Sequence, residues 1–293
     1  MFSGSIVAIV TPMQADGSID YDAFVRLIKW HLTMQTDGIV VLGTTGESPT
    51  IHADERRRLI DLAVETVNDE VPIIVGTGAN ATDKAIELTQ EAMEHGASAA
   101  LLVTPYYNKP TQEGLYQHFK AIAEAVPLPQ ILYNVPSRTG CDLLPETAIR
   151  LSNFSNIVAI KEATGDLSRV DTFIEAECDL DLLTGDDGTA LEFLMKGGKG
   201  VISVVANVVP QMFHDMCVAA VNGENLQAEQ LDKQMRPLYK VLFAESNPIP
   251  IKWVMEKMGL IQGGIRLPLV KLSEKYHHDV RDAFKNTDLV LAE

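Results

Sequence analysis

Residues 38–48 read Gly38-Ile39-Val40-Val41-Leu42-Gly43-Thr44-Thr45-Gly46-Glu47-Ser48. The near-continuous apolar run at the start of this stretch is typical of a parallel strand that is buried on both faces. A glycine- and threonine-rich turn follows the run, and Asp54–Val67 then carries apolar residues near helical spacing. The stretch therefore predicts a strand, a turn and a helix in succession, which is the βα unit of an α/β fold.

The same unit repeats eight times along the chain. The expected strands are Ile6–Val10, Gly38–Leu42, Pro72–Val75, Ala99–Val103, Gln130–Tyr133, Ile157–Ile160, Asp181–Leu183 and Gly200–Val204. The expected helices are Tyr21–Met34, Asp54–Val67, Thr82–His95, Gln112–Ala125, Pro145–Leu151, Ser168–Ala176, Thr189–Met195 and Pro210–Val221. Eight successive units predict an α/β fold that closes as a (β/α)8 TIM barrel, with a doubly wound sheet as the alternative.

The last part of the chain carries no strand signal. Helical patterns are expected at Asn225–Phe243, Ile251–Met258 and Ser273–Leu291. We therefore predict a catalytic (β/α)8 barrel over residues 1–223. Residues 224–293 are expected to form a C-terminal helical region that packs on the barrel and could contribute to assembly.

Charge and composition exclude several classes of partner. The chain has 24 basic and 40 acidic residues, a formal charge of −16. This balance argues against nucleic acid or a membrane surface, because both attract clustered Lys and Arg. No apolar run approaches the roughly 20 residues of a membrane-spanning helix, and the N-terminus lacks signal-peptide features. Cys141, Cys178 and Cys217 are few and scattered, which indicates a reducing compartment. We expect a cytoplasmic protein.

No cofactor and no metal are expected. Gly76–Ala81 has the G-x-G-x-x-A spacing of a dinucleotide-binding turn, but no acidic strand-end residue follows at the proper distance. A redox function that uses this loop is the weakest alternative. His277, His278 and Asp279 are adjacent in the sequence, so they cannot share one face of a helix as metal ligands would.

Lys161 is the first candidate for chemistry, because TIM barrels carry their active sites where strands end. It follows the apolar run Asn156–Ile160, and strand alternation directs it to the same side as Ala159. If that side is the barrel interior, desolvation lowers the pKa of the amine and favours the neutral form that attacks a carbonyl. The alternative is a lysine that pairs with Glu162 or extends into solvent.

Other strand ends carry further polar candidates. Thr44 and Thr45 lie in a turn whose N–H groups and hydroxyls could bind a carboxylate. Tyr133 and Tyr107 could relay protons, and Arg138 could bind a carboxylate through both arms of its guanidinium. Each has a structural alternative when taken singly. These are a tight βα turn for the threonines, packing for the tyrosines and an exposed loop position for the arginine.

Taken together, these segments resemble the class I aldolase superfamily that contains dihydrodipicolinate synthase and N-acetylneuraminate lyase. The segments are Gly43–Glu47, Tyr133–Pro136 and Lys161-Glu162, and the resemblance extends from Gly4–Pro12 through Pro248–Pro250 to Arg266–Pro268. It is closer to the dihydrodipicolinate synthase family. In that family an arginine at the position of Arg138 binds the carboxylate of the second substrate, and the sugar-acid lyases usually lack it.

The resemblance implies a lyase that forms a Schiff base with pyruvate and condenses it with L-aspartate 4-semialdehyde. The product would be 4-hydroxy-tetrahydrodipicolinate, in the first committed step of lysine and diaminopimelate biosynthesis. The implied catalytic residues are Lys161 as the nucleophile, Tyr133 as the acid and base, and Thr44 and Tyr107 as a proton relay. The implied substrate-binding residues are Thr45, Arg138, Gly185 and Ile202.

The resemblance also implies a homotetramer built as a dimer of dimers, in which a neighbouring subunit contributes Tyr107. The nearest alternative is a superfamily aldolase that acts on a 2-keto-3-deoxy sugar acid or on N-acetylneuraminate. A catalytically idle barrel with a binding role is a further alternative. Such a barrel is expected to lack Lys161, Tyr133 or Thr44, and none of them is missing.

A second site departs from the family pattern. Feedback-regulated relatives bind L-lysine in a cleft between subunits, and their contacts at Ser48, Asn80 and Tyr106 are present in this chain. However, Arg56 stands where those relatives have a histidine, and Lys84 where they have a glutamate. Two cations repel the ammonium groups of lysine. We therefore predict a degenerate regulatory cleft, with weak or absent inhibition by lysine.

Overall fold

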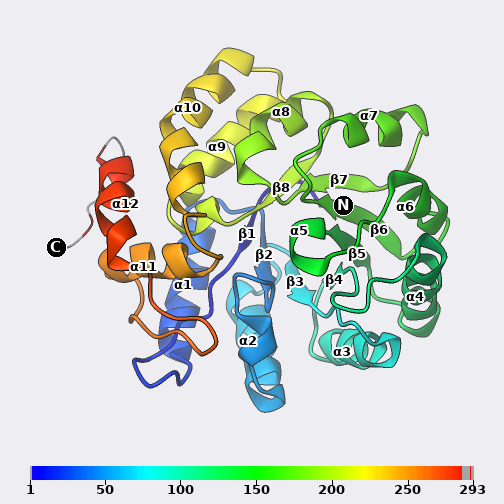
Figure 1. The fold of residues 1–293 in the computed structure, drawn as a ribbon, viewed down its shortest axis with the longest axis horizontal. Helices are drawn as coiled ribbons and strands as arrows, with labels where there is room; N and C mark the ends of the chain where they lie inside the picture. The colour runs from blue at the N-terminus through cyan, green and yellow to red at the C-terminus, as the bar shows by residue number, and fades with distance from the viewer. Residues whose placement is uncertain (1, 286–290, 292–293) are drawn as a thin grey trace.

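Eight parallel strands close into a barrel in chain order in the computed structural model, which describes residues 2–285 and 291 (Figure 1). The strands are β1 (Gly4–Ala8), β2 (Gly38–Val41), β3 (Ile73–Gly76), β4 (Ala99–Val103), β5 (Gln130–Asn134), β6 (Ile157–Glu162), β7 (Asp181–Thr184) and β8 (Gly200–Ser203). β8 pairs with β1, where Ile202 lies opposite Ile6. The (β/α)8 barrel is therefore confirmed. The doubly wound alternative is wrong, because such a sheet has two open edges.

Helices alternate with the strands around the barrel. They are α1 (Tyr21–Thr33), α2 (Ala53–Val67), α3 (Thr82–Glu94), α4 (Gln112–Ala125), α6 (Pro145–Leu151), α7 (Ser168–Glu175), α8 (Ala190–Met195) and α9 (Pro210–Val221). The loops contain a short helix, α5 (Pro136–Thr139), and the 3-10 turns η1 (Ser48–Thr50), η2 (Asp187–Thr189) and η3 (Val205–Asn207). Asp20 caps α1 by accepting a hydrogen bond from the Ala23 N–H at 2.9 Å, so the start of this helix follows from its sequence.

Two strands, β6 and β1, differ from their expected bounds by two residues; β2, β3, β5, β7 and β8 differ by one, and β4 matches. β6 extends to Glu162 instead of Ile160, because the backbones of Lys161 and Glu162 pair with those of Tyr133 and Asn134 in β5. β1 begins and ends two residues earlier than expected. Beyond its end, the Val10 N–H donates to the Asn207 side chain at 3.1 Å and leaves the sheet. Backbone pairing, and not side-chain polarity, sets these strand ends.

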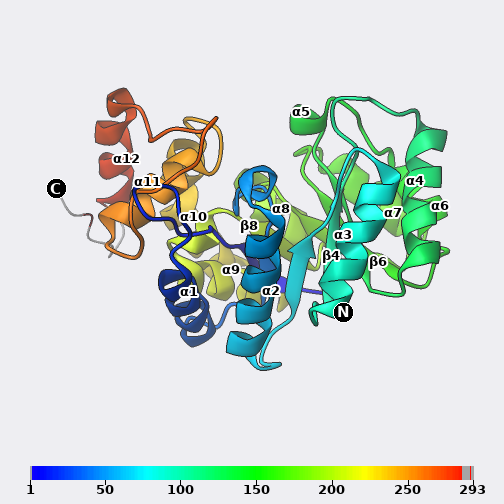
Figure 2. The same ribbon diagram turned by 90° about the horizontal axis from the view of Figure 1, so that it is seen from below.

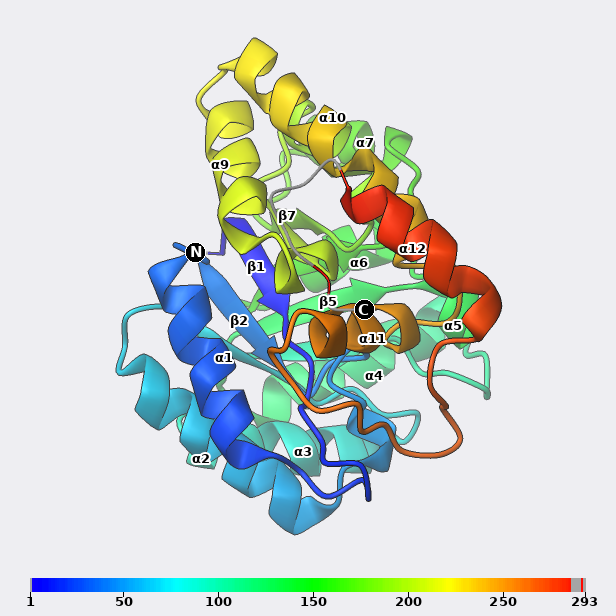
Figure 3. The ribbon, with the colours of Figure 1, turned by 90° about the vertical axis from the view of Figure 1, so that its left-hand side faces the viewer.

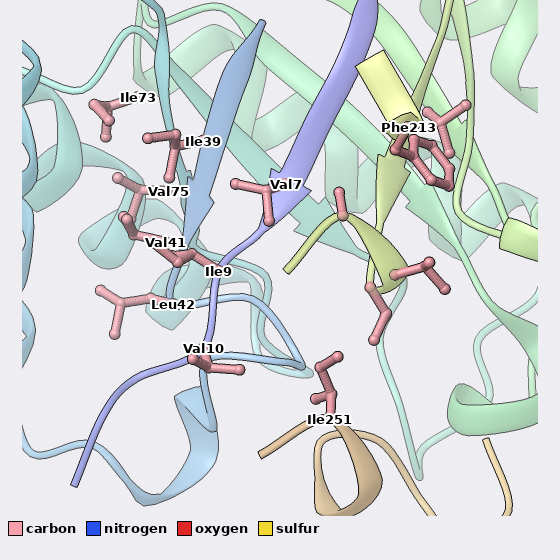
Figure 4. Close-up of a cluster of buried hydrophobic side chains, with 14 of the residues drawn as sticks. Val7, Ile9, Val10, Ile39, Val41, Leu42, Ile73, Val75, Phe213 and Ile251 are labelled. Carbon is pink, nitrogen blue, oxygen red and sulfur yellow. The ribbon is translucent and has the colours of Figure 1, made fainter. Parts of the chain in front are cut away.

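The strands separate two apolar layers, because successive residues face opposite sides. The layer between strands and helices includes Val7, Ile39, Val41, Ile73 and Val75 (Figure 4). The inner layer fills the barrel with Phe2, Ile6, Ala8, Val40, Ile74, Ala99, Leu101, Ile131, Tyr133, Val135, Ala159, Leu183 and Ile202. Since Ala159 faces inward, Lys161 also faces the interior, as the alternation predicts.

Close backbone packing accounts for the glycines of the Gly76–Ala81 loop. A Cβ on Gly76 would overlap the carbonyl of Leu42 in the neighbouring loop, and a Cβ on Gly78 would overlap the backbone of Val103 at the end of β4. Neither site tolerates a side chain while the neighbouring backbones stay in place. The G-x-G spacing here therefore follows from the packing of adjacent barrel segments.

The C-terminal region comprises α10 (Asn225–Val241), α11 (Ile249–Lys257), η4 (Glu274–Tyr276) and α12 (His277–Phe284). Figures 2 and 3 show these helices together on one side of the barrel. α10 packs against α9 and α8, and α12 packs against α10. The helix expected over Ser273–Leu291 is thus a 3-10 turn and a shorter helix, and residues 286–290 lie outside the described residues. The division of the chain at residue 223 stays a prediction.

A buried ion pair ties this region to the barrel. Lys252 of α11 contacts the carboxylate of Glu47, in the turn after β2, and the two side chains are 5% and 1% exposed. α11 begins at Ile249, two residues earlier than expected, because Pro250 lies in the first helical turn, where no N–H donor is needed. Among the described residues, no helix is long and apolar enough to cross a membrane.

Candidate active site

Lys161 is buried at the interior end of β6. Its side chain is only 6% exposed, and its Nζ lies 4.3 Å from the centre of the Tyr133 ring. Burial lowers the pKa of Lys161 to about 7; the charge of Asp187 opposes this shift and that of Arg138 adds to it. A substantial fraction of the amine is therefore neutral near pH 7, as a nucleophilic lysine requires.

Gly185, which follows β7, makes room for the lysine. A Cβ at this position would overlap Cε of Lys161 and would lie 3.1 Å from the Ala163 Cβ. Ile202 of β8 is 1% exposed in the inner layer of the barrel. The structure thus places both predicted lining residues at the barrel interior, and Gly185 directly against the Lys161 side chain.

Tyr133 faces Lys161 from the adjacent strand, since the two residues are in register between β5 and β6. Burial raises the pKa of the Tyr133 phenol, while the nearby Arg138 charge and a hydrogen bond with the Thr44 side chain oppose that rise. The phenol therefore keeps its proton at neutral pH. A protonated hydroxyl beside the amine can donate a proton to a leaving hydroxyl group or to an oxygen that gains negative charge.

The alternative in which Lys161 pairs with Glu162 is wrong, because Glu162 faces the other side of the sheet. Its Oε2 accepts hydrogen bonds from Asn134 Nδ2 at 3.1 Å and from Arg169 at 3.3 Å. Arg169 also donates to Asp142 at 2.6 Å, and Asn134 donates to Asp142 at 2.8 Å. This closed network fastens β5 to β6 behind the site and so fixes the register of Tyr133 against Lys161.

Asp187 is a site residue that sequence reasoning did not single out. It opens η2 after β7 and is 1% exposed. Its Oδ2 accepts the backbone N–H groups of Val204 at 3.1 Å and Val205 at 3.2 Å. Burial raises the pKa of Asp187 to about 6, against the opposing effect of its hydrogen bonds. At neutral pH it is mainly an anion, and its charge raises the pKa of Lys161.

The turn after β2 has the predicted threonines at the same end of the barrel. Thr45 is 2% exposed, and its Oγ1 accepts a hydrogen bond from Asn247 Nδ2 at 3.0 Å. Thr11 holds the turn by donating to the Gly46 carbonyl at 2.7 Å. The Lys252 contact fixes Glu47, whose φ of 57° lies in the left-handed region. This turn is rigid, as a carboxylate cradle needs to be.

Arg138 lies on α5, immediately after β5. It is exposed, and its Nη2 donates to the backbone carbonyl of Asn247 at 3.4 Å. Its positive charge lowers the pKa of both Tyr133 and Lys161. An exposed guanidinium beside an enclosed amine can bind an anionic ligand that enters the site.

Tyr107 is not brought to the other candidates within this chain. Its side chain is 88% exposed with a φ of 77°, and its backbone N–H donates to the Thr139 carbonyl at 3.3 Å. The neighbouring Tyr106 is 42% exposed. A relay through Tyr107 therefore needs a second chain, and its role in the relay stays a prediction.

The expected regulatory residues lie on α2, α3 and the adjoining loops. Arg56 is 6% exposed and donates to Ser48 Oγ and to the Gly76 carbonyl, both at 3.2 Å. Its Nε faces Glu91 at 3.8 Å, so part of its charge is balanced. Arg56 thus engages the Ser48 hydroxyl in a hydrogen bond and also adds a positive charge to the cleft.

Of the three remaining cleft positions, Lys84 and Tyr106 are exposed and Asn80 is half-buried. Lys84 pairs with Glu87 at 2.7 Å, and Asn80 donates to the Tyr106 carbonyl at 3.3 Å. The exposed Lys84 ammonium keeps a positive charge on this side of the molecule, because a surface ion pair is weak in water.

Packing accounts for one of the adjacent histidines. His277 stacks on Trp253 with ring centres 4.5 Å apart, and its Nε2 lies 3.1 Å from the Leu272 carbonyl. Across residues 2–285 and 291, His, Cys, Asp and Glu side chains form no group of three or more that could hold a metal ion. The absence of any cofactor stays a prediction.

Comparison with known proteins places this geometry in a family. A sequence model of the dihydrodipicolinate synthetase family matches residues 1–287. A 4-hydroxy-tetrahydrodipicolinate synthase of Coxiella burnetii is 61% identical over 289 residues, which is 99% of both chains.

Two solved structures are also similar. The chloride-inhibited dihydrodipicolinate synthase of Acinetobacter baumannii, complexed with pyruvate, has a TM-score of 0.97 and 50% identity, over 99% of this chain and 100% of that chain. A monomeric dihydrodipicolinate synthase variant has a TM-score of 0.96 and 43% identity, over 99% and 98% of the two chains.

Proposed function

Because the chain belongs to the dihydrodipicolinate synthetase family, we propose that it condenses pyruvate with L-aspartate 4-semialdehyde to give 4-hydroxy-tetrahydrodipicolinate. This is the first committed step of lysine and diaminopimelate biosynthesis, and it makes the protein a lyase of the class I aldolase type. The observation that carries the mechanism is the buried Lys161 amine, whose pKa of about 7 supplies a nucleophile at neutral pH.

Imine formation is the first chemical step. The neutral Lys161 amine adds to the ketone carbon of pyruvate, and the pyruvate carboxylate binds at the turn of Thr44 and Thr45. Tyr133 donates a proton to the departing hydroxyl, so water leaves and a cationic imine remains. The buried Asp187 carboxylate stabilises that cation, because a charge pair is stronger in a desolvated site than in water.

Carbon–carbon bond formation follows. Tyr133, which gave up its proton when water left, takes a proton from the methyl group and so converts the imine into an enamine. The nucleophilic carbon of the enamine attacks the aldehyde carbon of L-aspartate 4-semialdehyde. The aldehyde oxygen takes a proton from Tyr133. The amino group of the second substrate then adds to the imine carbon, which closes the ring and breaks the bond to Lys161. The lysine is free for another cycle.

Arg138 is proposed to bind the carboxylate of the second substrate. Its guanidinium is exposed and its charge acts on the enclosed Tyr133 and Lys161, which matches an aldehyde that arrives after pyruvate is bound. A carboxylate fits the two parallel N–H donors of arginine. This residue favours the synthase over an aldolase for N-acetylneuraminate or a 2-keto-3-deoxy sugar acid.

The working form is proposed to be a cytoplasmic homotetramer, a dimer of dimers. The support is Tyr107, which is 88% exposed, so its side chain is available to enter a site on another subunit. In that arrangement Tyr107 completes the relay that runs from Tyr133 through Thr44 to water.

Arg138→Ala tests the choice of second substrate. We expect kcat/KM for L-aspartate 4-semialdehyde to fall about 10- to 100-fold, because a hydrogen bond to a charged group contributes about 1.5–3 kcal/mol. Imine formation with pyruvate should persist. Arg150→Ala, which removes an exposed arginine paired with Glu113, is the control. Undiminished condensation by Arg138→Ala, or faster cleavage of a sugar acid than condensation by the unaltered chain, would contradict the proposal.

The pH dependence of imine formation tests the state of Lys161. The rate of trapping by borohydride should be level above pH 7 and fall about tenfold for each unit below it, because only the neutral amine reacts. In Asp187→Asn the inflection should move to lower pH, since the Asp187 charge raises the pKa of Lys161. An inflection near the ordinary lysine value of 10.5 would sink this part of the mechanism.

Lysine inhibition tests the regulatory cleft. We expect the unaltered chain to keep its activity when lysine is titrated through the millimolar range, because Arg56 is hydrogen-bonded to the Ser48 hydroxyl and Lys84 adds positive charge. The double variant Arg56→His with Lys84→Glu should become measurably inhibited. Strong inhibition of the unaltered chain at sub-millimolar lysine would show that the cleft is intact.

A further inference from the structure

Asn247, between α10 and α11, contacts residues proposed to bind both substrates. Its side chain is 6% exposed, and its Nδ2 donates to Thr45 Oγ1 at 3.0 Å. Its backbone carbonyl accepts a hydrogen bond from Arg138 Nη2 at 3.4 Å. Asn247 therefore contacts Thr45, in the turn proposed to bind pyruvate, through its side chain. It contacts Arg138, which is proposed to bind the second substrate, through its backbone.

The direction of the Thr45 contact has a chemical consequence. A threonine hydroxyl has one donor hydrogen and two acceptor lone pairs. Because the Asn247 amide donates, it occupies a lone pair of Thr45 Oγ1 and leaves the O–H free to donate elsewhere. A carboxylate only accepts hydrogen bonds, so this free donor is the group that pyruvate needs.

The segment that carries Asn247 is held independently of Thr45. The Ile249 N–H donates to the Ser246 carbonyl at 2.9 Å, and the Lys252 N–H donates to the Pro248 carbonyl at 3.0 Å. The buried pair of Lys252 and Glu47 fixes α11 to the same turn. Asn247 is therefore presented to Thr45 by a scaffold that does not depend on the amide itself.

We propose that Asn247 is a positioning residue that orients the Thr45 hydroxyl toward the carboxylate of pyruvate. The inference rests on the proposed function and deepens it at the first substrate. Only the side chain of Asn247 contacts Thr45, whereas Arg138 contacts its backbone. Side-chain substitutions therefore weaken pyruvate binding and leave L-aspartate 4-semialdehyde binding nearly unchanged.

The test compares steady-state constants for the two substrates in the full-length protein. In Asn247→Ala, KM for pyruvate should rise about 3- to 10-fold, the loss expected for one neutral hydrogen bond, with kcat and the other KM within about twofold. In Asn247→Asp, the rise should be larger. An ionised aspartate only accepts, so the Thr45 O–H turns to it and away from pyruvate. Because this change is nearly isosteric, it also serves if Asn247→Ala fails to fold.

Two controls separate positioning from a general structural effect. Asn222→Ala, at the exposed C-terminal end of α9, should change neither KM. In a Thr45→Val background, Asn247→Ala should add less than about a twofold effect on kcat/KM for pyruvate, because its target hydroxyl is gone.

The inference is overturned if both KM values rise equally, if Asn247→Asp binds pyruvate as well as the unaltered chain, or if the losses of the two single variants multiply. Failure of the unaltered chain to condense the two substrates would instead overturn the proposed function.

Discussion

The desolvated Lys161 amine is the constraint on which the rest of the site depends. An ordinary lysine has a pKa of 10.5 and is protonated at neutral pH, so it cannot attack a ketone. The barrel removes water from this amine by surrounding it with the inner apolar layer, to which Ala159 and Leu183 belong. Gly185 provides the space for the lysine chain. Asp187 opposes the effect of burial and keeps the pKa of Lys161 from falling further. In the proposed mechanism the same carboxylate stabilises the cationic imine.

Two sets of contacts outside the interior hold this arrangement. Behind the sheet, Glu162 and Arg169 fasten β6 to β5, which keeps Tyr133 opposite Lys161. At the end of the barrel, the C-terminal region reaches the turn after β2 through Lys252 and Asn247. The helices added to the barrel thus contact the turn that is proposed to bind the pyruvate carboxylate. Lys252 supplies the counter-charge of the buried Glu47, and a buried carboxylate without one is a costly arrangement.

Sequence periodicity predicted the barrel and placed Lys161 on the same side of its strand as Ala159, because both depend on local patterns; the structure shows that this side is the interior. It did not predict that β6 continues to Glu162, since that end is set by pairing with β5. The roles of Tyr133, Thr44 and Arg138 came from family resemblance, and the structure supports a shared site for them. Asp187 and Asn247 were missed for another reason. An aspartate next to Asp186 and an asparagine 202 residues after Thr45 gain their meaning only from contacts that the fold creates.

The most direct test of the central claim is to find which lysine forms the imine. The protein is reduced with borohydride in the presence of pyruvate, digested and analysed by peptide mass spectrometry. The account predicts a reduced pyruvyl adduct on the peptide that contains Lys161. Lys252 is the natural internal comparison, because burial also lowers its pKa while its partner Glu47 opposes that shift. An adduct on Lys252, or no adduct on the Lys161 peptide, would contradict the account.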